Sequence, residues 1–132
     1  MRMDSNVNER VTSPLIHDLS AIAQYDNVAI ALEDVGDYRA CNCAGHDELE
    51  RRFDAGTNAR ELVRLRADFV DAILVQLWHR TELADSPHAL LAVGGFGRRE
   101  LHPYSDIDIA IVLGAKASKS QLAAIARLTT FL

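Results

Sequence analysis

The chain has 132 residues, of which 48% are hydrophobic and 25% are charged, and this composition is that of a globular protein with room for one core. Its formal net charge of -5 at pH 7 argues against a nucleic-acid binder that works through a basic surface. No stretch approaches the roughly 20 apolar residues of a membrane span, and the N-terminus has no apolar signal core, so we expect a cytoplasmic protein without membrane or nucleic-acid partners.

Residues 1–45 predict a poorly defined extension of helix and loop. Ser13 and Pro14 suit the first positions of a helix. Apolar residues then recur at helical spacing, namely Leu15, Ile16, Leu19, Ile22 and Ala23. Residues 33–43 carry charges, small polar side chains and Gly36, which favours a loop or a broken helix.

Two cysteines, Cys41 and Cys43, lie close to His46 at the end of this extension. Structural zinc normally takes four ligands, and the sequence has no second pair of cysteines. We therefore expect reduced thiols here and no zinc site.

Residues 46–132 predict the main domain, which begins with a short helical stretch and a long helix. Gly56 separates the two, and Thr57 or Asn58 can cap a helix over about 59–83. Its apolar residues recur at spacings of three and four, namely Leu62, Leu65, Phe69, Val70, Ile73, Leu74, Leu77 and Trp78. The other side is charged and favours a solvated face, with Arg60, Glu61, Arg64, Asp68, Asp71 and Arg80.

Two short apolar runs follow and predict strands over about 88–94 and 106–113. The first run shows no alternation, as expected of a strand covered on both faces. Ser118 and Gln121 have the spacing of a capping box and predict a helix from about residue 118. The apolar pattern of this helix continues to the last residue, so we expect the sequence to be part of a longer protein.

The connection between the two strands carries the residues suited to phosphate binding. Gly94 and Gly95 follow the first strand directly, where glycine lets the backbone approach a ligand closely. Their N–H groups can hold a phosphate, especially if residues 96–101 form a helical turn. Ser105 adds a hydroxyl.

Asp106 and Asp108 stand two residues apart at the start of the second predicted strand. Alternation places both carboxylates on one face, about 7 Å apart along the chain, while Ile107 and Ile109 point into the core. Two such carboxylates repel each other unless a cation lies between them, and Mg²⁺ bound to triphosphate oxygens is a common solution. A pair of ions about 3.5–4 Å apart would serve in-line attack at an α-phosphate.

Other phosphate and metal motifs do not fit this spacing. Glu100 stands where a dinucleotide fingerprint needs its third glycine, and Ala110 stands where an EF-hand needs an oxygen ligand. The Walker A pattern is absent from the sequence. A polar hairpin with a glycine turn and two surface aspartates remains the alternative without function.

Residues 90–113, LLAVGGFGRRELHPYSDIDIAIVL, resemble the nucleotide site of a known superfamily. Gly94-Gly95, ten intervening residues and Asp106-Ile107-Asp108 are similar to the signature of the DNA polymerase beta-like nucleotidyltransferases. The longer string GGFGRRELHPYSDID resembles the bacterial uridylyltransferase/uridylyl-removing enzymes that modify the PII nitrogen-signalling protein. Arg99 stands where that family usually has glycine, and Phe96 where it often has tyrosine.

This resemblance implies an α+β fold in which N-terminal helices pack on the first strands of a mixed nucleotidyltransferase sheet. It implies an enzyme that transfers UMP from UTP to a tyrosine of PII with Mg²⁺. Asp106 and Asp108 would be catalytic and bind metal, and Gly94, Gly95, Ser105 and Arg98 would bind the nucleotide. Arg98 has the simpler alternative of an ion pair with Glu100.

One departure limits these expectations. The resembled transferases use a third carboxylate from a later strand, and no Asp or Glu follows Asp108 in this sequence. We therefore expect a weak or inactive transferase in this chain by itself. The alternatives are a nucleotide-binding or interaction remnant without catalysis, and a minimal nucleotidyltransferase with another acceptor.

Overall fold

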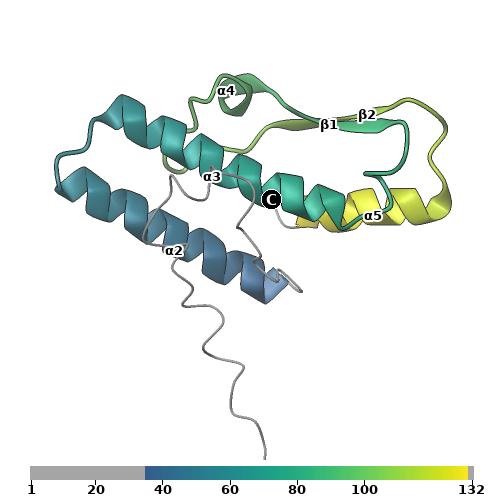
Figure 1. Ribbon diagram of the computed structural model, residues 1–132, viewed down its shortest axis with the longest axis horizontal. Coiled ribbons are helices and arrows are strands. Elements are labelled where there is room, and N and C mark those ends of the chain that lie inside the picture. Colours follow the sequence, from purple (N-terminus) through teal and green to yellow (C-terminus); the bar gives the residue numbers. More distant parts are fainter. Residues whose placement is uncertain (1–34, 131–132) are drawn as a thin grey trace, which may run out of the picture.

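The computed structural model describes residues 35–130, which form four helices and a two-stranded sheet, an α+β fold (Figure 1). The helix predicted from Ser13 lies outside these residues. None of the helices over residues 35–130 is long and apolar enough to cross a membrane.

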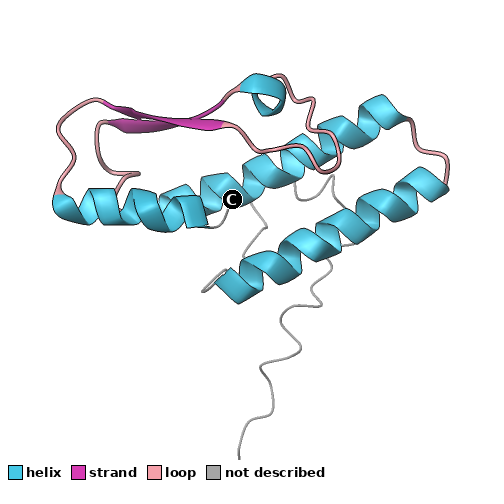
Figure 2. Cartoon of the chain, turned by 180° about the vertical axis from the view of Figure 1, so that it is seen from behind, coloured by secondary structure: helices cyan, strands magenta, loops and turns pink. Residues whose placement is uncertain are grey.

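Helices α2 (Val35–Asp54) and α3 (Ala59–His79) lie side by side as a helical hairpin (Figures 1 and 2). The prediction of a loop or broken helix over residues 33–43 is wrong from Val35 onward, because α2 is continuous there. Tertiary packing explains this result. Glycine weakens an isolated helix, but at Gly45 it allows α2 to approach α3 closely. A Cβ atom at this position would lie 2.4 Å from the Phe69 ring.

Helix α3 begins at a capped end and supplies most of the core. The Asn58 side chain accepts a hydrogen bond of 2.9 Å from the Arg60 amide, which confirms the predicted cap. The helix ends at His79, four residues before the predicted end, and the Thr81 hydroxyl then donates to the Trp78 carbonyl at 2.8 Å. Its buried residues belong to the predicted apolar stripe or adjoin it, namely Ala67, Phe69, Val70, Ala72, Ile73, Leu74 and Leu77.

Strands β1 (His88–Ala92) and β2 (Ile109–Leu113) pair antiparallel, with Leu90 opposite Ile111. The inner face of this sheet packs on the core through Leu90, Ile109 and Ile111. Its outer face is open, with Leu91 46% and Val112 50% exposed, so the expectation that β1 is covered on both faces is wrong. Figures 1 and 2 show the reason: helices α3 and α5 lie on one side of the sheet, and no other described element lies on its outer side.

Helix α5 (Lys119–Thr130) follows the sheet and returns beneath it (Figure 1). The capping box is confirmed, because the Gln121 amide donates to the Ser118 hydroxyl at 3.1 Å and the Ser118 amide donates to the Gln121 side chain at 2.9 Å. Leu128 of α5 is 2% exposed and belongs to the same core as Ile73 of α3. A two-stranded sheet is marginal alone, and this packing on two helices stabilises it.

Glu48 gives the helical hairpin a pH-dependent stability. The side chain is buried, and hydrogen bonds from Arg51, with further help from Arg52, lower its pKa from 4.5 to about 2. A carboxylate with a lowered pKa in the folded state stabilises that state above its unfolded pKa. This contribution should be lost as the pH falls from about 4.5 through about 2.

Thermal unfolding of the wild-type chain and of Glu48→Gln between pH 7 and pH 2 checks this expectation. The wild-type midpoint should fall more steeply below pH 4.5 than that of Glu48→Gln, which has no carboxylate to protonate. Glu50→Gln is the matched control, because Glu50 is an exposed glutamate on the same helix. Parallel profiles for the wild type and Glu48→Gln would contradict the role assigned to this carboxylate.

Candidate functional site

The glycine pair forms a tight turn at the end of β1. Helix α4 (Gly94–Gly97) is one short turn that begins directly at the glycines, two residues before the predicted segment 96–101. Gly94 has φ +59, a left-handed conformation that disfavours residues with a Cβ atom. The Glu100 amide donates to the Gly95 carbonyl at 2.9 Å and closes the turn. The glycine pair therefore turns the chain away from the sheet at the end of β1.

The structure brings Gly94 together with Asp108. The Val93 amide donates to the Asp108 carbonyl at 3.0 Å, which extends the pairing of the two strands by one position. A Cβ atom at Gly94 would lie 2.6 Å from Oδ2 of Asp108, so the carboxylate rests against the glycine backbone. The two ends of the motif, Gly94 and Asp108, are fourteen residues apart in the sequence and thus meet in one place.

Asp106 and Asp108 precede β2, which begins at Ile109, so the expectation that both belong to the strand is wrong. The strand pairing ends there because the chain that follows β1 turns away from β2 at Gly94 and enters α4. The alternation persists without the ladder: Ile107 and Ile109 pack against the core, while Asp106 and Asp108 are both exposed. The carboxylates therefore belong to the open, outer side of the sheet.

Ser105 is held by a helix that the sequence did not connect with it. Its hydroxyl donates to the His102 carbonyl at 2.7 Å, and Nη1 of Arg66 donates to the Ser105 hydroxyl at 3.4 Å and to the His102 carbonyl. Among the described residues these are the hydrogen bonds of the Ser105 side chain, and none reaches the glycine turn. Arg66 thus places a positive charge beside Ser105, a residue predicted to bind the nucleotide. No sequence motif indicated this arginine.

Arg98 forms the ion pair that the sequence offered as its alternative role. Nε of Arg98 lies 3.1 Å from Oε2 of Glu100, and both side chains are more than half exposed. Nη2 of Arg98 also lies 4.0 Å from the position of a Cβ atom at Gly95. An exposed pair of this kind contributes little to stability.

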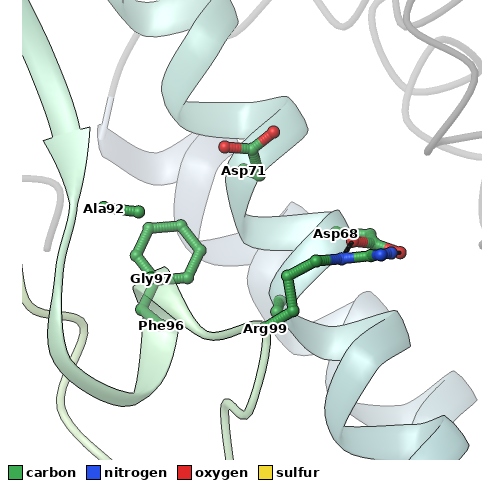
Figure 3. A pocket seen from close by; sticks show the side chains of 7 residues that line it. Asp68, Asp71, Ala92, Phe96, Gly97 and Arg99 are labelled. Atoms are coloured by element: carbon green, nitrogen blue, oxygen red, sulfur yellow. Dashed lines mark hydrogen bonds and ion pairs between the residues drawn. The ribbon is translucent and has the colours of Figure 1, made fainter.

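Arg99 contacts α3 across a pocket of about 340 Å³ beside the glycine turn. Figure 3 shows Asp68 and Asp71 of α3 on one side of this pocket and Phe96 on the other, with Arg99 reaching to Asp68. Nε of Arg99 donates to Oδ1 of Asp68 at 2.8 Å, and Nη2 donates to Oδ2. The charged side of α3 was predicted to be a solvated face, yet Asp68 is 21% exposed and anchors the motif loop.

The chemistry of the site suits a hard cation at its carboxylates. Asp106 and Asp108 offer the oxygen ligands that Mg²⁺ prefers. No group of three or more His, Cys, Asp or Glu residues that could hold a metal ion occurs within residues 35–130. On α2, burial raises the pKa of the Cys41 thiol to about 11, and Cys43 is exposed.

Comparison with known proteins identifies a matching family. Residues 45–132 match the family described as "Putative nucleotidyltransferase DUF294". This match contains α3, the sheet, the glycine turn and both aspartates. No solved structure matches the chain.

Curated relatives carry the name bifunctional uridylyltransferase/uridylyl-removing enzyme. The protein from Pseudomonas putida is 47% identical over 95 residues, which are 71% of this chain and 10% of the relative. That from Pseudomonas syringae pv. tomato is 56% identical over 68 residues, 51% of this chain and 8% of the relative. That from Nitrosospira multiformis is 44% identical over 78 residues, 59% of this chain and 9% of the relative. The chain thus spans about a tenth of the length of these relatives.

Proposed function

Since this chain belongs to the DUF294 nucleotidyltransferase family, we propose that its glycine turn and paired aspartates bind UTP with Mg²⁺ for transfer of UMP to a protein hydroxyl. In this reaction the hydroxyl gives up its proton to a base, its oxygen bonds to the α-phosphorus of UTP, and the bond from that phosphorus to pyrophosphate breaks. The names of the relatives support uridylyl transfer, because each is called a uridylyltransferase/uridylyl-removing enzyme.

The contact of Asp108 with Gly94 carries this proposal. It joins a glycine turn to a carboxylate that can hold a cation, because a Cβ atom at Gly94 would lie 2.6 Å from Oδ2 of Asp108. Both belong to the outer side of the sheet, where exposed Leu91 and Val112 leave room for a ligand. A structural hairpin without function would not require a charged group pressed against a left-handed glycine.

Each proposed site residue has a distinct task. The backbone of Gly94 and Gly95 receives the phosphates, and Arg98 leaves Glu100 to neutralise their charge. Ser105 donates a hydrogen bond to the triphosphate after releasing the His102 carbonyl. Asp106 and Asp108 hold Mg²⁺, which when bound offsets phosphate charge and activates the attacking hydroxyl.

The acceptor and the compartment belong to the same proposal. We infer a tyrosine of the PII protein as acceptor from the resemblance of the motif string to the PII-modifying uridylyltransferases. UTP and a signalling protein meet in the cytoplasm, so that is the proposed location. The open outer face of the sheet leaves the site accessible to a protein substrate.

Nucleotide binding without transfer is the second candidate for this chain by itself. One observation favours it: residues 109–132 contain no Asp or Glu, and residues 35–130 hold no group of three carboxylate, imidazole or thiol ligands. Two carboxylates can hold a cation and a nucleotide, whereas deprotonating an acceptor hydroxyl takes a further base.

Calorimetric titration of the chain with UTP, with and without Mg²⁺, tests the proposal. We expect Mg²⁺-dependent binding, because the carboxylates repel the triphosphate unless a cation lies between them. Radiolabelled UTP with PII then separates the two candidates, since label transferred to PII establishes catalysis and binding without label establishes the second. Absence of binding under both conditions would overturn both.

A further inference from the structure

The connection from the glycine turn to the aspartates contains two residues in an unfavourable backbone conformation. Arg99 has φ +57 and Tyr104 has φ +63, both in the left-handed region. Side chains with a Cβ atom seldom adopt this region, and such residues persist where their surroundings hold them. Something outside the loop must therefore stabilise its shape.

Helices α2 and α3 supply these external contacts. Arg99 makes a two-pronged ion pair with Asp68, and the Tyr104 ring lies edge-on to the His46 ring of α2, with centroids 5.5 Å apart. Between them, Arg66 donates to the His102 carbonyl. The Asp68 side chain is 21% exposed and its partner Arg99 is 61% exposed, while Tyr104 is 88% exposed.

We propose that Asp68 is a positioning residue of the nucleotide site, whose ion pair with Arg99 holds the strained turn that connects Gly94–Gly95 to Asp106–Asp108. This inference rests on the proposed nucleotide site. It also accounts for a residue with a Cβ atom at this left-handed position. Glycine adopts a left-handed φ without penalty, whereas arginine needs the compensating contact that Asp68 provides.

The geometry connects this clamp directly to the phosphate turn. Arg99 follows α4 after one residue, and its amide donates to the Phe96 carbonyl at 2.9 Å within the turn itself. Phe96 is 4% exposed and fixes the other side of the same pocket (Figure 3). Releasing Asp68 would remove the two hydrogen bonds that tie the Arg99 side chain to this carboxylate of α3.

The test combines hydrogen exchange without nucleotide and titration with Mg²⁺-UTP on one set of variants. Asp68→Asn should speed exchange of the amides of residues 98–100 and weaken binding of Mg²⁺-UTP about threefold to fivefold, near the upper limit for a partly exposed ion pair. Arg99→Gly should bind within about twofold of the wild type, because glycine holds the turn without the clamp. In the Arg99→Gly background, Asp68→Asn should then have no further effect.

Asp54→Asn at the end of α2 is the control for loss of one carboxylate, and its exchange and binding should match the wild type. Unchanged exchange of residues 98–100 in Asp68→Asn would overturn the inference. It would also be overturned if Asp68→Asn weakened binding equally in the wild type and in the Arg99→Gly variant. If the wild type binds no nucleotide, the proposed function fails and the positioning role fails with it, while faster exchange in Asp68→Asn would still establish the clamp itself.

Discussion

Replacing Asp108 by asparagine should strongly weaken the Mg²⁺-dependent binding of UTP by this chain. Asparagine keeps the size of the side chain that rests against Gly94, so the turn should survive. It removes the negative charge and one hard oxygen ligand, and loss of a ligand should weaken binding of Mg²⁺-UTP by at least about tenfold to a hundredfold. Titration of the variant with UTP in the presence of Mg²⁺ measures the loss.

Thermal unfolding separates a lost ligand from a damaged fold. In EDTA the Asp108→Asn variant should unfold at or slightly above the wild-type temperature, because Asp106 and Asp108 no longer repel each other. With Mg²⁺-UTP the wild type should gain stability and Asp108→Asn should gain much less, since a ligand stabilises the state to which it binds. Asp54→Asn should behave as the wild type in both solutions. Equal stabilisation of Asp108→Asn and the wild type would remove Asp108 from the site.

Replacing Gly94 by alanine should also weaken nucleotide binding, but by moving the carboxylate. The new Cβ atom would lie 2.6 Å from Oδ2 of Asp108, so the carboxylate or the turn must shift. Alanine at φ +59 adds a backbone penalty of about 1–2 kcal/mol. We expect binding of Mg²⁺-UTP to weaken by at least about tenfold, together with a loss of stability of this size or somewhat more.

Gly56→Ala is the matched control for this substitution. Gly56 has φ +88, so alanine is at least as unfavourable in its backbone, but no atom lies within 4 Å of the Cβ position. Urea denaturation of both variants measures the cost in stability, and titration with Mg²⁺-UTP measures the site. Both variants should lose stability, and only Gly94→Ala should lose binding. Loss of binding in both would show that general destabilisation, and not the contact with Asp108, is responsible.

The glycine turn, the Asp68–Arg99 clamp and the aspartates together form the proposed site, which the helices support from the inner side of the sheet. The inner face of the sheet packs on α3 and α5 through Leu90, Ile109 and Ile111, which leaves the outer face for the ligand. Arg66 and Asp68 lie on α3 two residues apart, and each contacts a different part of the loop between the glycines and the aspartates. The long helix is therefore a support for the loop as well as a core element.

Local sequence determined the features that depend on neighbouring residues. The cap at Asn58 and the capping box of Ser118 and Gln121 follow from side chains that bond to amides two or three residues away. The apolar stripe of α3 follows from the helical period alone. The family itself was evident from the glycine pair, the spacing and the aspartates, because that string of residues is specific.

Only the tertiary structure decided the features that depend on contacts distant in sequence. The continuity of α2 through residues 35–43 goes with the fit of Gly45 against the Phe69 ring, a contact that no local propensity contains. The strand β2 begins three residues later than predicted because its partner turns away at Gly94. The contacts of Arg66 and Asp68 with the loop span more than 30 residues, and their charges alone resemble those of any solvated helix face. Sequence thus specified the chemistry of the site, and packing across the chain specified how that chemistry is held in place.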